Sequence, residues 1–316
     1  MSTINQNYIN NEFRLPGAST LIILNGVYQP KLSDPLPNIV FSGKTLAVPK
    51  NTSVKPPIHL LFLTSEDSLS SLELVAEENS YITIIEEHAS LGDKPYTSDI
   101  KININAKTNS EIMHYKLQFA NTEHAKQQTI NNIEQAAGSK ITSCFISKGA
   151  KIAHDVLDIS LAGRNASINI KGINLLHHTQ DMSNQIRISH LEPSCTSTVL
   201  AKSIVDDQAI NNFACRVIAN SGATKTETHV TNKNLLLSEK AVANTSPELE
   251  TYVDDVICTH GATVGQLDAE ALFYLRSRGI TKSSAINMLI SAFVQEITDQ
   301  FVNYERFRII AGLNHG

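Results

Sequence analysis

A cysteine and a histidine stand two residues apart near the end of the chain, and their side chains could bind a metal together. Cys258 and His260 are separated by Thr259 and followed by a glycine-rich turn. Residues two apart in a β-strand project from the same face, whereas in a helix they diverge. A sulfur and an imidazole nitrogen on one face suit zinc, copper or iron–sulfur chemistry. The local secondary structure therefore decides whether these residues form a site.

Spacing alone leaves two interpretations of this pair open. In the first, Cys258 is half-buried and His260 lies on the surface of the last strand, because free cysteine often packs as a small apolar residue. In the second, both side chains are ligands to a metal or to sulfur. Two ligands cannot complete a tetrahedral site, so the second interpretation requires further ligands from a partner chain or from a cluster.

Paired acids elsewhere in the chain do not form a recognisable catalytic site. Three such pairs occur, at residues 86–87, 206–207 and 254–255. Neighbouring strand residues face opposite ways, so we expect each pair to be solvated charges. Glycoside hydrolysis needs two carboxylates that face one bond, and the sequence offers no such pair. A polysaccharide-acting enzyme is therefore a weak alternative.

The other histidines and cysteines with catalytic potential are predicted to be structural. They are His177, His178, His190, Cys144, Cys195 and Cys215. No ligand spacing links the histidines, so we expect surface positions or hydrogen bonds. The cysteines include no C-x-x-C pair, so we expect them at core or rim positions and not in a disulfide framework. Walker-type, G-x-S-x-G and H-E-x-x-H motifs are absent, so we expect no ATP hydrolysis by this chain alone.

Composition narrows the range of partners. The 316 residues are 41% hydrophobic and carry a net charge of −5, with scattered Lys and Arg, so nucleic acid is not expected. Tryptophan is absent and aromatic residues make up 6%, which argues against a stacking platform for bases or sugars. Residues 1–12 lack signal-peptide features, and the apolar runs at 21–24 and 60–63 are too short to cross a bilayer. We therefore expect a cytoplasmic protein without membrane contact.

The elements that would position Cys258 and His260 change in character near residue 266. Before it, short runs alternate between β-branched and polar residues, which is typical of strands with one buried face. Examples are residues 81–85, 100–106, 167–171, 185–189, 198–205 and 226–230. Several breaks between runs lie about fifteen residues or a multiple apart, without a clean repeat. A sandwich, a barrel and a stacked β-solenoid all fit, and the asparagine-rich turns favour the solenoid.

The two ends of the chain differ from this strand-rich middle. Asn25 and Gly26 predict a tight turn within a small hairpin over residues 21–28, and prolines up to Pro57 mark the boundary of the strand-rich region. After Gly265 the pattern becomes helical.

Capping residues define the predicted helices of the tail. Asp268 is a suitable N-cap for a helix over residues 269–278, and Gly279 a suitable C′ residue. A second helix begins near Thr281, and a third piece covers residues 301–311. The apolar face of the second helix is predicted to contain Ala285, Met288, Leu289, Ala292, Phe293 and Ile297.

Residues 253–280 resemble the C-terminal signature of the SufB/SufD family of iron–sulfur cluster assembly scaffold proteins. The segment that matches is VDDVICTHGATVGQLDAEALFYLRSRGI, and the shorter segments NGVYQPKLSD, TNKNLLL and SPEL match earlier in the chain. SufB members have an E-H-E-A-T-type sequence where this chain has CTHGAT, so the chain looks like the SufD members. SufD members usually carry a longer helical N-terminal region, which is expected to be shortened or absent here.

The resemblance implies a mainly β fold, with a right-handed parallel β-helix core and a small C-terminal α-helical domain. The expected parts are an N-terminal segment (1–54), the core (55–255) and a strand, turn and helices (256–316). It also implies a non-catalytic scaffold that pairs with SufB through the β-helix edge. SufC, an ATPase, would dock on the helices and be the only route to ATP, and a homodimer could form in isolation.

The resemblance further implies a transient iron–sulfur cluster at the interface with SufB, bound near Cys258 and His260. Six tail residues are expected to bind SufC: Phe273, Tyr274, Arg276, Arg278, Leu289 and Phe293. The remaining alternative is a purely structural β-helix adaptor with no ligand role.

Overall fold

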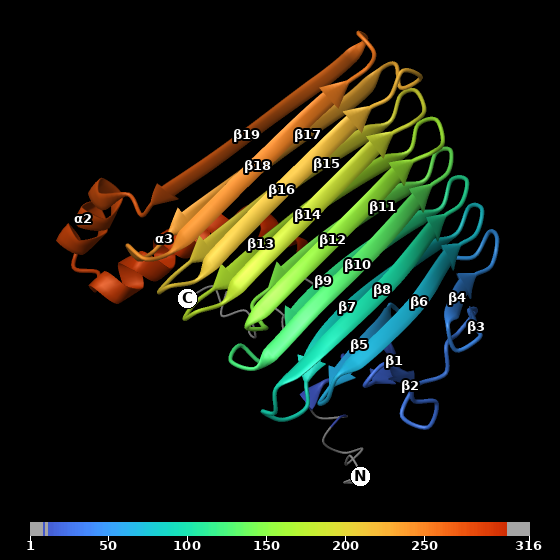
Figure 1. The fold of residues 1–316 in the computed structure, drawn as a ribbon, viewed down its shortest axis with the longest axis horizontal. Coiled ribbons are helices and arrows are strands. Elements are labelled where there is room, and N and C mark those ends of the chain that lie inside the picture. The colour runs from blue at the N-terminus through green and yellow to red at the C-terminus, as the bar shows by residue number, and fades with distance from the viewer. Residues whose placement is uncertain (1–8, 10–11, 302–316) are drawn as a thin grey trace.

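The computed structural model describes residues 9 and 12–301. In them the chain winds into a parallel β-solenoid of about eight turns, followed by two helices (Figure 1). Strands predominate and helices follow residue 266, so the predicted mainly β solenoid with a helical tail is confirmed.

Successive strands alternate between two sheets, named here sheet A and sheet B. Sheet A contains β1 (Ser19–Leu24), β2 (Val27–Tyr28), β5 (Ile58–Thr64), β7 (Tyr81–Ser90), β9 (Glu111–Phe119), β11 (Lys140–Ser147), β13 (Ser167–Leu176), β15 (Thr196–Val205), β17 (Thr226–Leu236) and β19 (Val256–Gln266). Sheet B contains β3 (Val40–Phe41), β4 (Thr45–Val48), β6 (Ser68–Ala76), β8 (Tyr96–Ala106), β10 (Ala125–Gln135), β12 (Ile152–Leu161), β14 (Asp181–His190), β16 (Ile210–Ala219) and β18 (Val242–Thr251). The six runs predicted as strands lie within β7, β8, β13, β14, β15 and β17.

Each turn of the solenoid takes about thirty residues and contributes one strand to each sheet. Ile112 pairs with Ile141, and Ile141 with Ile168, in steps of 29 and 27 residues. One strand with one turn takes half of this length, which explains the breaks that recur about every fifteen residues. The step varies because turns differ in length, so the repeat is hard to see in the sequence.

Asparagines in the left-handed conformation mark one corner of successive turns. Asn51, Asn79 and Asn109 have φ values of 57°, 55° and 54°. The Asn79 side chain donates to Asn51 Oδ1 at 3.0 Å, and Asn109 donates to Asn79 Oδ1 at 3.3 Å. Asparagine tolerates positive φ better than most residues and can bond along the stack. These side chains therefore form an external ladder that supports the corner.

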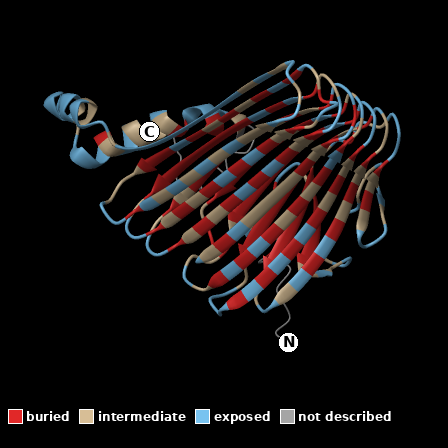
Figure 2. Cartoon of the chain, turned by 45° about the horizontal axis from the view of Figure 1, so that its top comes forward, coloured by how far each residue is buried: buried red, intermediate tan, exposed pale blue. Residues whose placement is uncertain are grey.

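Alternation along each strand separates interior from exterior side chains, and Figure 2 shows the resulting bands of burial. In β8, Ile100, Ile102 and Ile104 are between 2% and 4% exposed and belong to the core between the sheets. Because the strands pair in parallel and in register, like positions form interior columns from turn to turn.

Two hairpins lie at the N-terminal end of the solenoid. The β1–β2 pair is antiparallel, with Ile23 opposite Tyr28, and Asn25 and Gly26 form its turn, as predicted. The β3–β4 pair is also antiparallel. The β1 strand additionally pairs in parallel with β5, so it extends sheet A.

The tail contains α2 (Ala269–Ser277), α3 (Lys282–Thr298) and the short 3₁₀ helix η1 (Asp299–Phe301). As predicted, Asp268 caps α2 and a second helix begins near Thr281, which the structure shows to be the N-cap of α3. The predicted apolar face of the second helix is wrong at Met288, which is 50% exposed, and at Ala292, which is also exposed, whereas Val294 is 1% exposed. The predicted third piece, residues 301–311, lies almost entirely outside the described residues.

The second half of α3 is bound to the outer face of sheet A. Val294 and Ile297 pack in one cluster with Leu200. The ammonium group of Lys202 on β15 donates to the Phe293 carbonyl at 2.8 Å and lies 3.3 Å from Glu296. By contrast, α2 buries none of its residues. Within the described residues, no helix is both long and apolar enough to span a membrane.

The expectation of solvated charges is wrong for the Glu86 and Glu87 pair. Glu86 is 1% and Glu87 2% exposed. Glu86 accepts hydrogen bonds from His88 Nε2 at 2.6 Å and His114 Nε2 at 2.9 Å inside the solenoid, while Glu87 pairs with His59 at 3.0 Å. Both faces of sheet A are buried here, so neighbouring acids on opposite faces can both be covered.

The charge of Glu86 is stabilised by its neighbours. Burial alone raises the pKa of this carboxyl group, but the hydrogen bonds from His114 and His88, with the charges of His88 and Lys116, outweigh it. The pKa of Glu86 is therefore well below its usual value.

We expect Glu86→Gln to lower the free energy of unfolding near neutral pH by about 3 kcal/mol, because it breaks a buried charged network. A depressed folded-state pKa contributes stability above the unfolded pKa, and that contribution disappears as the pH falls towards the folded value. The deficit should therefore shrink in acid. Urea unfolding at several pH values measures it, with Glu78→Gln as control, since the Glu78 side chain is 45% exposed and pairs with Lys50 at the surface. Equal stability of both variants at neutral pH would contradict the assignment.

Candidate functional site

The strand that carries Cys258 and His260 is the last strand of sheet A. In β19 these residues pair with Thr228 and Val230 of β17, which are 0% and 1% exposed. Since paired residues in parallel strands share a face, both side chains project toward the solenoid interior. The condition that the sequence left open is therefore met, because Cys258 and His260 lie on a strand and share one face of it.

Among the described residues no further strand follows β19 in sheet A, so the two side chains are accessible at this open end. Cys258 is half-buried and His260 is exposed. Burial raises the pKa of the Cys258 thiol. This geometry permits the structural interpretation and also leaves the thiol and imidazole free to meet a partner.

On the opposite face of β19, Thr259 belongs to a group of polar side chains that we did not predict from the sequence. His229 Nδ1 lies 2.7 Å from Thr259 Oγ1, and His229 Nε2 lies 2.9 Å from Glu227 Oε1. These residues face outward, away from Cys258. Glu227 and Thr259 are far apart in the sequence, and only the register of β17 with β19 brings them together.

Cys258 and His260 do not form a complete metal site within this chain. In the described part of the chain, no group of three or more His, Cys, Asp or Glu residues could hold a metal ion. A tetrahedral site at this position would need ligands from elsewhere.

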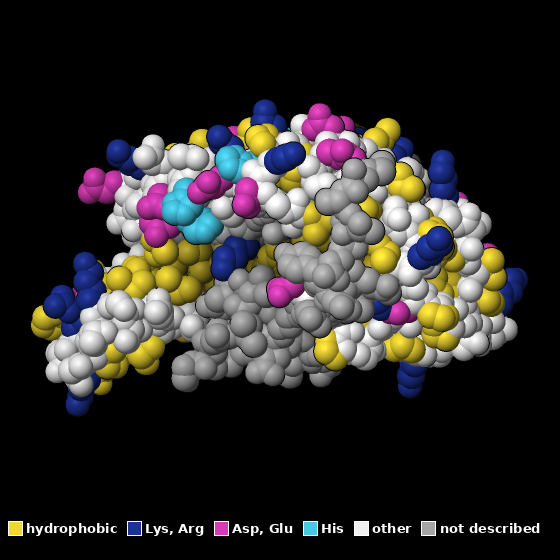
Figure 3. All heavy atoms as spheres, turned by 90° about the horizontal axis from the view of Figure 1, so that it is seen from below, with side chains coloured by type: hydrophobic (Ala, Val, Ile, Leu, Met, Phe, Trp, Pro, Cys, Tyr) yellow, Lys and Arg dark blue, Asp and Glu magenta, His cyan; other side chains and the backbone are white. Residues whose placement is uncertain are grey.

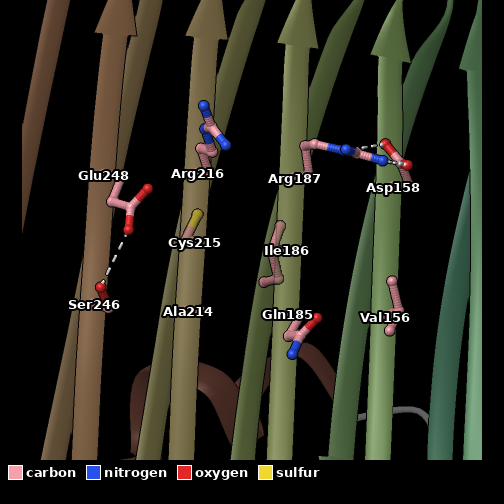
Figure 4. Close-up of a pocket in the computed structure, with 10 residues that line it drawn as sticks. All are labelled: Val156, Asp158, Gln185, Ile186, Arg187, Ala214, Cys215, Arg216, Ser246 and Glu248. Atoms are coloured by element: carbon pink, nitrogen blue, oxygen red, sulfur yellow. Dashed lines mark hydrogen bonds and ion pairs between the residues drawn. The ribbon is translucent and has the colours of Figure 1, made fainter.

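A shallow hollow lies on the outer face of sheet B (Figure 4). Its volume is about 340 Å³, and Gln185 and Ala214 line it. The neighbouring Arg187 pairs with Asp158 on the next strand, as Figure 4 shows. Arg216 pairs with Glu250. Because carboxylates already neutralise both guanidinium groups, the hollow offers little to an anion.

A second histidine group lies at the turns between the sheets. The rings of His177 and His178 stack with their centroids 4.5 Å apart, and His178 pairs with Asp207 at 3.2 Å. Figure 3 shows histidine side chains among acidic ones on the face seen from below. The expectation of surface or hydrogen-bonded histidines is confirmed here, and also for the buried His190, which lies 2.9 Å from Ser197 Oγ.

The six tail residues expected to bind SufC do not share one environment. Phe273 and Tyr274 of α2 are 74% and 57% exposed, and the Arg278 guanidinium lies over the Tyr274 ring. Leu289 is half-buried, and Phe293 packs toward sheet A beside Lys202. Arg276 is exposed. The free apolar surface of the tail is therefore concentrated on α2.

Comparison with known proteins identifies the family. A model described as "SUF system FeS cluster assembly, SufBD core domain" matches residues 62–293. The chain belongs to the SufB/SufD family of iron–sulfur cluster assembly proteins. The match covers the solenoid from β5 and most of the helical tail.

Individual SufB/SufD relatives agree with this assignment. The iron–sulfur cluster assembly protein SufD of Escherichia coli is 34% identical over 224 residues, 70% of this chain and 52% of that protein. A SufBD family protein of Synechocystis is 33% identical over 268 residues, 80% of this chain and 58% of that protein. SufD of Bacillus subtilis is 24% identical over 274 residues. The chain thus spans little more than half the length of the first two relatives.

We expect only Cys258 to react with a thiol reagent in the folded protein. Cys144, Cys195 and Cys215 are buried, as predicted, and burial raises the pKa of each thiol, to about 11 for Cys144 and about 12 for Cys215. Titration with a chromogenic disulfide should show one thiol before and four after denaturation. Cys258→Ser should abolish the native reaction, and a remaining native thiol would contradict the placement of the others.

Proposed function

We propose that this chain is a SufD-type, non-catalytic scaffold subunit for iron–sulfur cluster assembly. The observation that carries the proposal is the open end of the solenoid, where β19 presents Cys258 and His260 on one face beside an unpaired strand edge. The similarity to SufD of Escherichia coli supports it.

The open end is suited to pairing with a second β-solenoid. In the part of the chain that the structure describes, β18 and β19 are the last strands of their sheets, so each leaves a row of backbone N–H and C=O groups available. Val242, Ile257 and Val264 are 41%, 61% and 47% exposed there. Strand addition would satisfy the backbone groups and bury this apolar surface. We assign SufB as the partner, and a second copy of this chain is the alternative occupant when SufB is absent.

The two side chains at this end are a partial ligand set for a cluster under construction. A soft thiolate and an imidazole suit iron and sulfide, and ligands from SufB would complete the coordination. A transient cluster is the cargo here. An incomplete site in each partner keeps the ligands accessible until the two ends meet.

The helical tail is the proposed docking element for SufC. The exposed apolar side chains of α2, with Arg276 nearby, offer a surface that a protein partner would cover. The chain lacks a phosphate-binding loop, so ATP would act only through SufC. Only Leu267 and the cap Asp268 separate β19 from α2, so a force on α2 would be delivered to β19.

The competing function is that of a purely structural adaptor. The amount of iron and sulfide bound to the assembled complex distinguishes it from a scaffold whose side chains bind the cluster. We expect His260→Ala to leave folding and SufB binding intact and to reduce iron and sulfide loading roughly tenfold, since a ligand is lost. Cys258→Ser should have a smaller effect, because burial favours the protonated thiol, whose proton a metal must displace. His154→Ala, at an exposed histidine of sheet B, is the control. Normal loading in the His260→Ala complex would favour the adaptor.

SufC docking is tested on α2. We expect Phe273→Asp to weaken SufC binding by about thirtyfold or more, as for loss of an aromatic hot spot. The chain should remain folded, because the side chain is 74% exposed. Leu69→Asp is a matched control, since Leu69 is 76% exposed on β6 at the other end of the solenoid. Titration calorimetry with purified SufC measures both, and equal affinities would refute docking through this face.

A further inference from the structure

The last turn of the solenoid carries a strong excess of negative charge. Between Glu239 and Asp255 there are five acidic residues and one lysine, a net charge of −4, against −5 for the whole chain. The turn beneath it, residues 206–236, has three acidic and three basic residues and no net charge. The excess of acid is therefore found where the two sheets end.

Most of these carboxylates have no cationic partner in the described part of the chain. Glu250 is the exception, because it pairs with Arg216 of the neighbouring strand. The other four are exposed and form no salt bridge among the described residues: Glu239, Glu248, Asp254 and Asp255. Each would gain free energy from a Lys or Arg side chain brought close to it.

The four unpaired carboxylates lie along the two open strand edges. Glu239 precedes β18, Glu248 lies within it, and Asp254 and Asp255 lie in the turn between β18 and β19. The edges themselves are long, with 10 residues in β18 and 11 in β19. A strand added to either edge would bring its own side chains beside these acids. Charge at this end would therefore influence which strand is added.

Pairing between the open ends of two copies of this chain would bring like charges together. A two-fold contact places the same surface on both sides of the interface. Whichever register the strands adopt, a surface of net charge −4 then faces another of net charge −4. Like charges across an interface disfavour the complex in which they meet.

The opposite end of the solenoid has the complementary charge but offers little strand edge. Residues 12–57 contain five basic and two acidic residues. The two hairpins lie at this end, and a loop covers the rest of β1: the Gln29 N–H donates to the Ile22 carbonyl at 2.9 Å and the Asp34 N–H to the Thr20 carbonyl at 2.8 Å. A copy stacked head to tail would therefore meet the right charge without an edge to pair with.

We propose that the acidic open end selects a partner solenoid whose facing end carries Lys and Arg side chains, and that it disfavours a second copy of this chain. The inference deepens the proposed function and rests on it for the identity of the partner, SufB. Cations of the partner would neutralise carboxylates that lack a counter-charge in the described chain, so association would be fast at low ionic strength and slower once salt screens the charges. The backbone ladder would stabilise the complex, and charge would determine which complex forms.

Neutralising the four unpaired carboxylates tests both halves of the proposal. The fourfold variant is Glu239→Gln/Glu248→Gln/Asp254→Asn/Asp255→Asn. The matched control removes the same charge at exposed acids on earlier turns: Asp99→Asn/Glu111→Gln/Glu134→Gln/Glu192→Gln. Stopped-flow mixing measures association with purified SufB, and sedimentation equilibrium measures self-association of each full chain alone. Both are carried out at about 50 mM and about 500 mM salt, which screen charge weakly and strongly.

We expect the fourfold variant to associate with SufB about tenfold more slowly than the wild type at low salt, and at nearly the same rate at high salt, as for loss of electrostatic steering. The same variant should self-associate about tenfold more tightly at low salt, because like charges no longer face each other. The control should match the wild type in both measurements. Loss of structure would weaken both associations, so opposite shifts for the two partners identify the charge effect.

Each half of the proposal has a result that overturns it. Unchanged or faster association with SufB in the folded variant would exclude a basic partner end, and unchanged self-association at low salt would exclude rejection of a second copy. Equal shifts in the control would attribute the effects to net charge and refute the role of the open end. Should the fourfold variant fail to fold, Asp254→Asn/Asp255→Asn, confined to the exposed turn, decides by the same criteria.

The two measurements also distinguish this inference from the proposed function. If the wild-type chain does not bind SufB, the proposed function fails and self-association decides: tighter dimers of the variant support an acidic end that rejects its own copy, and unchanged dimers refute it. If SufB binds the wild type and the variant at equal rates at low salt, pairing with SufB stands and this inference fails.

Discussion

The parallel backbone ladder is the constraint on which the rest of the structure depends. Each strand needs a neighbour on both sides to satisfy its N–H and C=O groups, and the two end strands of each sheet lack one. At the N-terminal end, β2 and β3 pair antiparallel with β1 and β4. At the other end β18 and β19 present long edges. The proposed site lies at the end where the ladder remains open.

The same ladder determines how polar residues are tolerated inside. Interior columns run from turn to turn, so a buried polar side chain must find its partner in an adjacent strand or across the narrow core. Asn211 shows this, since it bonds to both Asn174 and Asn234. Asn234 in turn donates to the Thr263 carbonyl of β19. Polar contacts thus reach the last strand from below, while nothing in the described chain covers it from above.

The local elements could be predicted from the sequence, whereas the features that depend on the stacking of the solenoid turns could not. Alternating residues define a strand within five to ten positions, and a cap such as Asp268 defines a helix start from neighbouring residues alone. The shared face of Cys258 and His260 needs only a strand, so it was predictable. The pairing of strands about thirty residues apart is a long-range property, and turns of unequal length hide it.

Glu86 and Glu87 are a clearer example of a feature that depends on stacking and that the sequence does not predict. Solvated charges are the ordinary outcome for neighbouring acids on a strand with one wet face, and Asp254 and Asp255 are indeed exposed. At Glu86 and Glu87 the outer face of sheet A is covered as well, and histidines at distant positions supply the bonds. No local pattern distinguishes the two cases, because His59 and His114 come from other turns and only His88 is a near neighbour in the sequence. The predicted face of α3 was wrong at Met288 for a related reason, since only the docked helix reveals which stripe meets the sheet.

Under the proposed function, the tail and the open end are parts of one device. The second half of α3 is attached to sheet A through Lys202 and apolar packing, whereas α2 buries nothing and follows β19 almost directly. A partner that holds α2 would therefore act on a strand that has a ladder neighbour on one side only, whereas the strands beneath it are held by two neighbours. Cys258 and His260 lie on that strand. Their position follows from the need for groups that stay ordered by the solenoid yet remain accessible at its edge.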